Sequence, residues 1–248
     1  MIQVKNKSCT LNSTITTTIM RFQLGQKLIK GVIFDMDGTM IDNMMIHHQA
    51  WQQQLATLGV VLPLDEVKAR IHGVNEEILT REFGDRFSSA ERKQIAWDKE
   101  AAYRAIYRDQ LELIQGLPAF LEQLDAHQIP YGIGTAAPGE NADFVVDELD
   151  IRSRFQAIVH AGHVQRGKPD PQVFELVAKK MNIPIQDCLV FEDSPTGAEA
   201  AERAGASSII LMTTHQAEEF AHFSSVYKTI PDFTHLKWNR LAENLHLI

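Results

Sequence analysis

Hydrophobic and polar residues are arranged in blocks along this chain of 248 residues, and the blocks predict strands and helices in turn. The run Val32-Ile33-Phe34 is continuously apolar and leads into acidic residues, which is typical of a buried strand in a parallel sheet. Later short apolar runs predict further strands at 131–134, 157–160, 188–191 and 207–212. Because helical patterns separate these runs, we expect right-handed βαβ units, and therefore an α/β fold with a Rossmann-like parallel sheet.

A helical segment interrupts this alternation directly after the first strand. Residues 43–112 carry apolar residues at helical spacing, and Ser88 with Glu91 matches the capping box that begins a helix. We interpret the segment as an all-helical cap domain inserted over the strand ends. The predicted core domain then comprises residues 25–42 and 113–248.

The first 24 residues fit neither domain. They are rich in Thr, Ser and Asn and contain no acidic residue, which superficially resembles an organelle transit peptide. They lack the apolar region of a secretory signal. We interpret residues 1–24 as a disordered leader, or as a mis-set start with translation beginning at Met20.

Composition and charge exclude several partners. The chain is 44% hydrophobic with a formal net charge of −8 and no basic stripe, which argues against nucleic-acid binding. No apolar stretch approaches the roughly 18–20 residues of a membrane-spanning helix, so no membrane partner is expected. Cys9 and Cys188 lie in unrelated contexts and predict neither a disulfide nor a zinc site. We expect a cytoplasmic protein that is a monomer or a weak oligomer.

Polar side chains follow three of the predicted strands. Asp35 and Asp37 follow the first strand, Thr135 follows the strand at 131–134, and the strand at 188–191 runs into Glu192-Asp193. Since ligands of open α/β sheets bind at the carboxyl ends of the strands, we expect these residues to converge. Clustered carboxylates suit Mg²⁺, and a hydroxyl with a lysine, here Lys168 in a loop before a helix, suits phosphoryl oxygens.

Each of these residues has an ordinary structural role when taken alone. Asp and Gly are common in turns, Ser194-Pro195 is a typical helix start, and Lys168 alone is most simply a solvated loop lysine. A calcium-binding EF-hand is excluded because residues 35–41 lack its ligand series. The joint occurrence at successive strand ends favours a functional site.

Four motifs in order give the chain a family resemblance. They are Phe34-Asp35-Met36-Asp37-Gly38-Thr39, Gly134-Thr135-Ala136, Gly167-Lys168-Pro169-Asp170-Pro171 and Phe191-Glu192-Asp193-Ser194-Pro195-Thr196-Gly197. Over about residues 30–212 the sequence resembles the haloacid dehalogenase superfamily, in the branch with a helical cap of the C1 type. That branch includes phosphatases and β-phosphoglucomutase-like enzymes.

The resemblance implies a role for each catalytic residue. Asp35 is the expected nucleophile, which forms an aspartyl-phosphate, and Asp37 is the expected general acid and base. Thr135 and Lys168 are expected to hold the phosphoryl oxygens. The cap is expected to exclude water and to select the substrate.

The resemblance also implies a Mg²⁺ cofactor. Its expected ligands are the Asp35 carboxylate, the backbone carbonyl of Asp37 and Asp193, with Glu192 bound directly or through water. Carbon–halogen hydrolysis is disfavoured, because that branch lacks an acid two residues after the nucleophile.

The chain departs from the β-phosphoglucomutase pattern at two places, and these departures favour a phosphatase over a mutase. His47 and Trp51 match the mutase His-x-x-x-Trp pattern, but Glu76 replaces the cap arginine that grips the second phosphate. Ala136-Ala137-Pro138-Gly139 likewise replaces a Ser-Lys-Asn run. The residues expected to line the substrate pocket are His47, His72, Asn75, Glu76 and Ala136.

The expected function is a Mg²⁺-dependent phosphohydrolase that acts on a small phosphorylated metabolite, such as a sugar phosphate. Two alternatives stay open: a β-phosphoglucomutase-like sugar-phosphate mutase, and a non-catalytic regulator with the same fold. The sequence does not identify the substrate.

Overall fold

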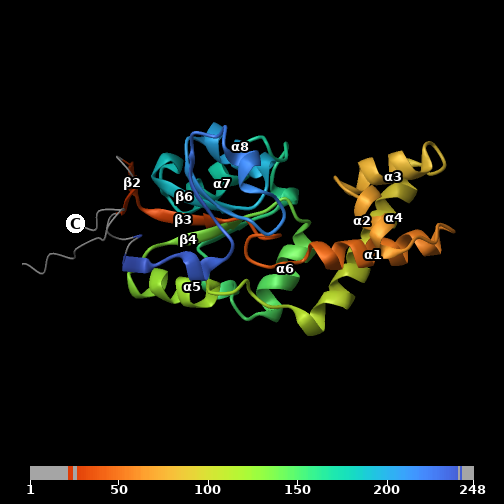
Figure 1. Cartoon of the computed structure of the whole chain (residues 1–248), viewed down its shortest axis with the longest axis horizontal. Coiled ribbons are helices and arrows are strands. Elements are labelled where there is room, and N and C mark those ends of the chain that lie inside the picture. Colours follow the sequence, from red (N-terminus) through yellow and green to blue (C-terminus); the bar gives the residue numbers. More distant parts are fainter. Residues whose placement is uncertain (1–21, 25–26, 240, 242–248) are drawn as a thin grey trace, which may run out of the picture.

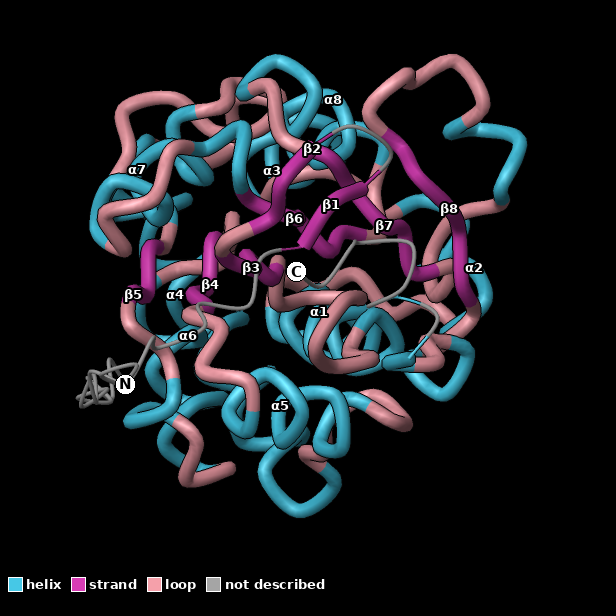
Figure 2. The backbone as a smooth tube through the Cα atoms, turned by 90° about the vertical axis from the view of Figure 1, so that its left-hand side faces the viewer, coloured by secondary structure: helices cyan, strands magenta, loops and turns pink. Residues whose placement is uncertain are grey.

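A parallel six-stranded sheet, in the order β5-β4-β3-β6-β7-β8, forms the centre of the molecule (Figure 2). The structure is a computed structural model, and it describes residues 22–24, 27–239 and 241. The strands of the sheet are β3 (Gly31–Phe34), β4 (Tyr131–Gly134), β5 (Ala157–Val159), β6 (Cys188–Glu192), β7 (Ser207–Leu211) and β8 (Val226–Ile230). The predicted α/β fold with a parallel sheet is confirmed.

Helices cover both faces of the sheet. One face carries α7 (Gln172–Lys180) and α8 (Pro195–Ala204), and the other carries α5 (Leu117–Ala126) and α6 (Gly139–Glu148) (Figures 1 and 2). Successive side chains of β3 enter opposite layers: Phe34 contacts Phe120 of α5 edge to face, whereas Ile33 packs in the cluster that contains Val177 of α7. Burial on both faces explains why the strand is continuously apolar.

Four helices lie together beyond the carboxyl ends of the strands, at one end of the elongated molecule (Figure 1). They are α1 (Met44–Thr57), α2 (Leu64–Arg70), α3 (Asn75–Phe83) and α4 (Ser89–Tyr107). The predicted capping box is present, since Glu91 accepts a 2.8 Å hydrogen bond from the Ser88 backbone and Ser88 Oγ accepts one from Glu91. All four helices fall within the predicted cap, although the domain boundaries themselves stay a prediction.

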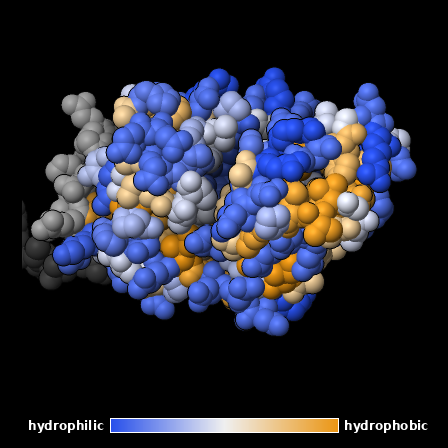
Figure 3. All heavy atoms as spheres, turned by 45° about the vertical axis from the view of Figure 1, so that its right-hand side comes forward, coloured by the Kyte–Doolittle hydropathy of each residue, from blue (hydrophilic) through white to orange (hydrophobic). Residues whose placement is uncertain are grey.

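The helical block has a small hydrophobic core of its own and several exposed apolar side chains. Its buried cluster comprises Trp51, Leu55, Val67, Ile71, Ile78, Leu79 and Ile95. Figure 3 turns this side of the molecule forward and shows hydrophobic patches between hydrophilic residues. The large exposed apolar side chains of the block are Met44, Met45, Val61, Val74 and Trp97. Within the described residues, no helix combines the length and the hydropathy needed to cross a membrane.

Three strands differ from the sequence predictions. Residues 22–24, which we placed in the leader, form β1 (Phe22–Leu24), which pairs in antiparallel orientation with β2 (Lys27–Ile29). Residues 1–21 of the predicted leader lie outside the described residues. Strand β8 was not predicted, because it is a partly exposed edge strand without a continuous apolar run.

Candidate active site

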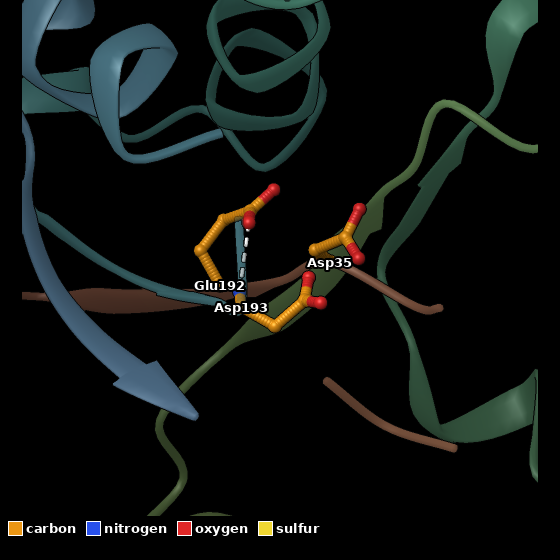
Figure 4. A group of neighbouring side chains, drawn as sticks. All are labelled: Asp35, Glu192 and Asp193. Atoms are coloured by element: carbon orange, nitrogen blue, oxygen red, sulfur yellow. Dashed lines mark hydrogen bonds between the residues drawn. The ribbon is translucent and has the colours of Figure 1, made fainter. Parts of the chain in front are cut away.

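The polar residues at the carboxyl ends of β3 and β6 meet at one edge of the sheet, because the two strands are adjacent and parallel. The backbone N–H of Asp35 donates to the carbonyl of Phe191 at 2.9 Å, which extends the pairing beyond β3. Asp35, Glu192 and Asp193 each offer a carboxylate oxygen, and these oxygens lie within 4.8 Å of one another (Figure 4). All three side chains are buried, with 5%, 1% and 6% of their surface exposed.

Lys168 supplies the positive charge that faces these acids. Its Nζ lies 2.5 Å from Asp35 Oδ1 and 2.6 Å from Glu192 Oε1. Burial alone would lower the pKa of Lys168, but the neighbouring Asp35 and Glu192 raise it above its usual value. The lysine is therefore charged and holds two of the three carboxylates.

One ammonium does not balance three buried carboxylates. Burial, opposed by Lys168 and reinforced by Glu192 and Asp37, raises the pKa of Asp35 to about 8. Burial and the charges of Glu192 and Asp35 also raise the pKa of Asp193 well above its usual value. A bound cation would relieve this excess of negative charge, and a cluster of carboxylate oxygens is the donor set that Mg²⁺ prefers.

The two acids at the end of β6 differ in how they are held. Glu192 Oε2 accepts hydrogen bonds from the backbone N–H groups of Asp193 and Ser194, both at 2.7 Å, while Oε1 accepts from Lys168. Figure 4 shows Glu192 folded back onto its own backbone and Asp193 pointing toward Asp35. Both oxygens of Glu192 therefore accept hydrogen bonds, and all three carboxylates are close enough together to hold a metal ion.

Asp37 is held by the residue that begins the helical block. Asn43, fully buried, donates from Nδ2 to Asp37 Oδ1 at 2.7 Å and to the Tyr103 hydroxyl of α4 at 2.7 Å. Burial raises the pKa of Asp37 to about 6, although the hydrogen bond from Asn43 opposes the shift. A carboxyl group that exchanges its proton near neutral pH suits general acid–base chemistry.

Thr135 lies directly after β4, next to β3 in the sheet, and is buried. Its Oγ1 accepts a 3.0 Å hydrogen bond from the backbone N–H of Ala137. No hydrogen bond from this hydroxyl is present within the described residues, so its hydrogen can point to a ligand oxygen. The neighbouring Ala136 is exposed.

Two of the predicted cap residues belong to a buried polar cluster in the helical block. Lys99 Nζ lies 2.8 Å from His47 Nδ1, and Glu100 Oε1 accepts from Lys99 at 2.9 Å and from Asn75 at 2.8 Å. The His47 ring also stacks on Tyr103 with its centroid 4.1 Å away. Burial and the charge of Lys99 lower the pKa of His47 to about 3, so the imidazole is neutral.

The cluster also joins the helical block to the sheet domain. Glu100 Oε2 accepts a 2.8 Å hydrogen bond from Asn141 of α6, and Arg104 donates to the other end of the same amide at 2.7 Å. The sequence did not predict a role for Lys99 or Glu100, because charged residues on a long helix are usually solvated. Asn43 was missed as well, although its place directly before a predicted helix marks it as a candidate cap residue.

The structure does not bring His72 and Glu76 to the acid cluster. Both are exposed: the His72 carbonyl accepts a 3.0 Å hydrogen bond from Arg81, and Glu76 pairs with Arg92 at 3.6 Å. Of the predicted cap residues, His47 and Asn75 have buried polar partners, and His72 and Glu76 lie on the surface.

Comparison with known proteins agrees with the fold and shows the family. The chain matches the haloacid dehalogenase-like hydrolases over residues 29–205, and it belongs to this family. It is 28% identical over 216 residues to the validoxylamine A 7'-phosphate phosphatase of Streptomyces hygroscopicus subsp. limoneus. The match covers 87% of this chain and 99% of that protein. It is 30% identical over 180 residues to the fructose-1-phosphate phosphatase of Escherichia coli, covering 72% of this chain and 94% of that protein.

A solved structure shows the same architecture. The crystal structure of β-phosphoglucomutase from Clostridium difficile superposes with a TM-score of 0.73 and 25% sequence identity, covering 87% of this chain and 96% of that one. The family and the named relatives identify this chain as a haloacid dehalogenase-like enzyme of the phosphatase kind.

Proposed function

We propose that this chain is a Mg²⁺-dependent phosphohydrolase that acts on small phosphorylated metabolites, such as sugar phosphates, through an aspartyl-phosphate on Asp35. The observation that carries the proposal is the position of Lys168 Nζ, 2.5 Å from Asp35 Oδ1 and 2.6 Å from Glu192 Oε1, beside the carboxylate of Asp193. The relatives that are named phosphatases of fructose 1-phosphate and validoxylamine A 7'-phosphate support this substrate class.

The reaction has two steps. In the first, an Asp35 oxygen forms a bond to phosphorus while the bond to the ester oxygen breaks, and Asp37 gives its proton to that oxygen. In the second, Asp37 takes a proton from water, the water oxygen attacks phosphorus, and the Asp35 carboxylate is released. Thr135 and Lys168 hold the phosphoryl oxygens and stabilise their charge.

The residues present fit a Mg²⁺ site. Asp35 and Asp193 would hold the ion with their carboxylates and Asp37 with its backbone carbonyl, while Glu192 orients the site or binds through water. When bound, the ion supplies positive charge that lowers the repulsion between the anionic nucleophile and the anionic phosphate.

Hydrolysis is favoured over mutase activity by what surrounds the site. Glu76, at the position of the mutase's cap arginine, is exposed and paired with Arg92. The stretch 136–139 offers no cationic side chain beside Thr135. A second phosphate on the substrate would therefore find no cationic side chain at either place.

The test is phosphate release from a panel of phosphate esters, with and without Mg²⁺, by the wild-type chain and two variants. Asp35→Asn should lower kcat by at least about 10³-fold, as expected for the loss of a covalent nucleophile. Asp85→Asn, an exposed aspartate in the helical block, should act like wild type. Activity that survives Asp35→Asn would contradict the nucleophile assignment.

The same preparations distinguish the two alternatives. A mutase would convert β-glucose 1-phosphate without net phosphate release and would depend on a bisphosphate activator. A non-catalytic regulator would hydrolyse no ester in the panel and would not bind a metal fluoride phosphate analogue in the presence of Mg²⁺.

A further inference from the structure

Two adjacent threonines on the loop after β7 contact both of the loops that carry the acids. Thr213 Oγ1 donates a 2.5 Å hydrogen bond to the carbonyl of Gly38, the residue after Asp37. Thr214 Oγ1 donates to Asp193 Oδ2 and lies 3.3 Å from the Asp193 backbone carbonyl. One short loop therefore ties the loop that follows β3 to the end of β6.

Gly38 and Thr214 both lie against the same oxygen of Asp193, Oδ2. A Cβ at Gly38 would lie 2.2 Å from Asp193 Oδ2, so the carboxylate rests directly against the Gly38 backbone. Gly38 has a φ of +76°, a backbone conformation that residues other than glycine rarely adopt. Its carbonyl accepts the hydrogen bond from Thr213. Asp193 Oδ2 thus rests against the Gly38 backbone and accepts the hydrogen bond from the Thr214 hydroxyl.

The hydrogen bond from Thr214 makes the two oxygens of Asp193 different. Oδ2 accepts the hydrogen bond from Thr214. Within the described residues, Oδ1 accepts no hydrogen bond. A hydrogen bond of this kind limits rotation of a carboxylate and leaves one oxygen facing its neighbours. Groups that orient metal ligands in this way commonly affect metal affinity as strongly as some ligands do.

We infer that Thr214 is a positioning residue that fixes the Asp193 carboxylate for Mg²⁺, and that Thr213 anchors the same loop to Gly38. The inference rests on the Mg²⁺ site of the proposed function. Within the described residues, no hydrogen bond joins either threonine to Asp35 or Asp37. They act through Asp193, which shares the site with Asp35 and Glu192.

The experiment measures Mg²⁺ affinity without substrate, by titration calorimetry and by the rise in Tm that Mg²⁺ causes. Thr214→Val keeps the shape of the side chain and removes its hydroxyl, so the Kd for Mg²⁺ should rise about 10- to 100-fold. Thr214→Ser keeps the hydroxyl and should bind Mg²⁺ close to the wild-type Kd. Thr57→Val, which removes a hydroxyl bonded at 2.7 Å to the Gln54 carbonyl in the helical block, is the matched control.

Two results would overturn the inference: unchanged Mg²⁺ affinity in Thr214→Val, or equally weakened affinity in Thr214→Ser. If Thr214→Val does not fold, Thr214→Ala compared with Thr214→Ser decides the same question. Phosphate release at saturating Mg²⁺ keeps the two proposals apart. Ester hydrolysis with Mg²⁺ affinity independent of Thr214 contradicts only the present inference, whereas Thr214-dependent Mg²⁺ binding without hydrolysis contradicts only the proposed function.

Discussion

The Asn43 side-chain amide donates a 2.7 Å hydrogen bond to Asp37 Oδ1, so the first residue of the predicted cap holds the carboxyl proposed as proton carrier. The same amide group donates to Tyr103 of α4, 60 positions further along the chain. The orientation of Asp37 therefore depends on the helical block as well as on its own loop.

Replacing Asn43 tests this dependence. Asn43→Ala removes a hydrogen bond to a charged group, worth about 1.5–3 kcal/mol, and should lower kcat at least about tenfold with little change in Mg²⁺ affinity. The control is Gln53→Ala, an exposed amide of α1. An unchanged kcat in Asn43→Ala would show that Asp37 is oriented by other groups.

The metal-free protein should lose stability as pH rises. The folded pKa of Asp35, about 8, lies above the usual aspartate value of 3.8, so between these values the folded state binds more protons than the unfolded state. The free energy of unfolding then decreases with increasing pH across this window. Urea unfolding with a chelator present should show the decrease, and both Asp35→Asn and saturating Mg²⁺ should reduce it. Equal slopes in all three samples would contradict the raised pKa.

His47 should remain neutral far into the acid range. Because its folded pKa is lowered from 6.5 to about 3, the unfolded state binds the extra proton first, and the stability linked to His47 is lost as pH falls below about 6.5. Nitrogen NMR shifts of the imidazole should stay at neutral values down to about pH 4. Lys99→Gln should raise the pKa by removing the neighbouring charge. A titration of the wild-type ring with a midpoint near 6.5 would refute the assignment.

Gly197→Ala should disrupt the end of β6. An added Cβ would lie 1.8 Å from the Glu192 carboxylate, so Glu192 must leave its hydrogen bonds to Lys168 and to the backbone. We expect a loss of about 3 kcal/mol in the free energy of unfolding, at the upper end for overpacking. Gly167→Ala is the control, because nothing lies within 4 Å of its added Cβ. Similar unfolding curves for the two variants would contradict the contact.

Much of the acid cluster could be predicted because strand ends are local signals. An apolar run followed by a carboxylate marks Asp35 and Glu192 in the sequence, and parallel neighbouring strands then bring them together. The same rule applied to the strand before Thr213 and Thr214 would have selected them. They were overlooked because hydroxyl residues after a strand are common and match no family motif.

The contacts of the helical block were much less predictable. Lys99 and Glu100 are adjacent charged residues on a long helix, a pattern typical of a solvated surface, yet both are buried. Their burial depends on packing against His47 and on the approach of Asn141 from α6. No local pattern contains such information. His72 and Glu76, which the family motif suggests for the substrate pocket, are exposed, and their role there stays a prediction.

The chain leaves the sheet and returns to it at one place, since the backbone N–H of Ile114 donates a 2.8 Å hydrogen bond to the carbonyl of Met40. Everything between these two residues is one continuous insertion whose ends are already joined. Such a segment can be exchanged as a cassette, in evolution or by design, without rethreading the sheet. A transplanted cassette would need to retain an Asn43-like donor to Asp37 and partners for Asn141 of α6, and with these provisions this scaffold offers a route to new substrate preferences.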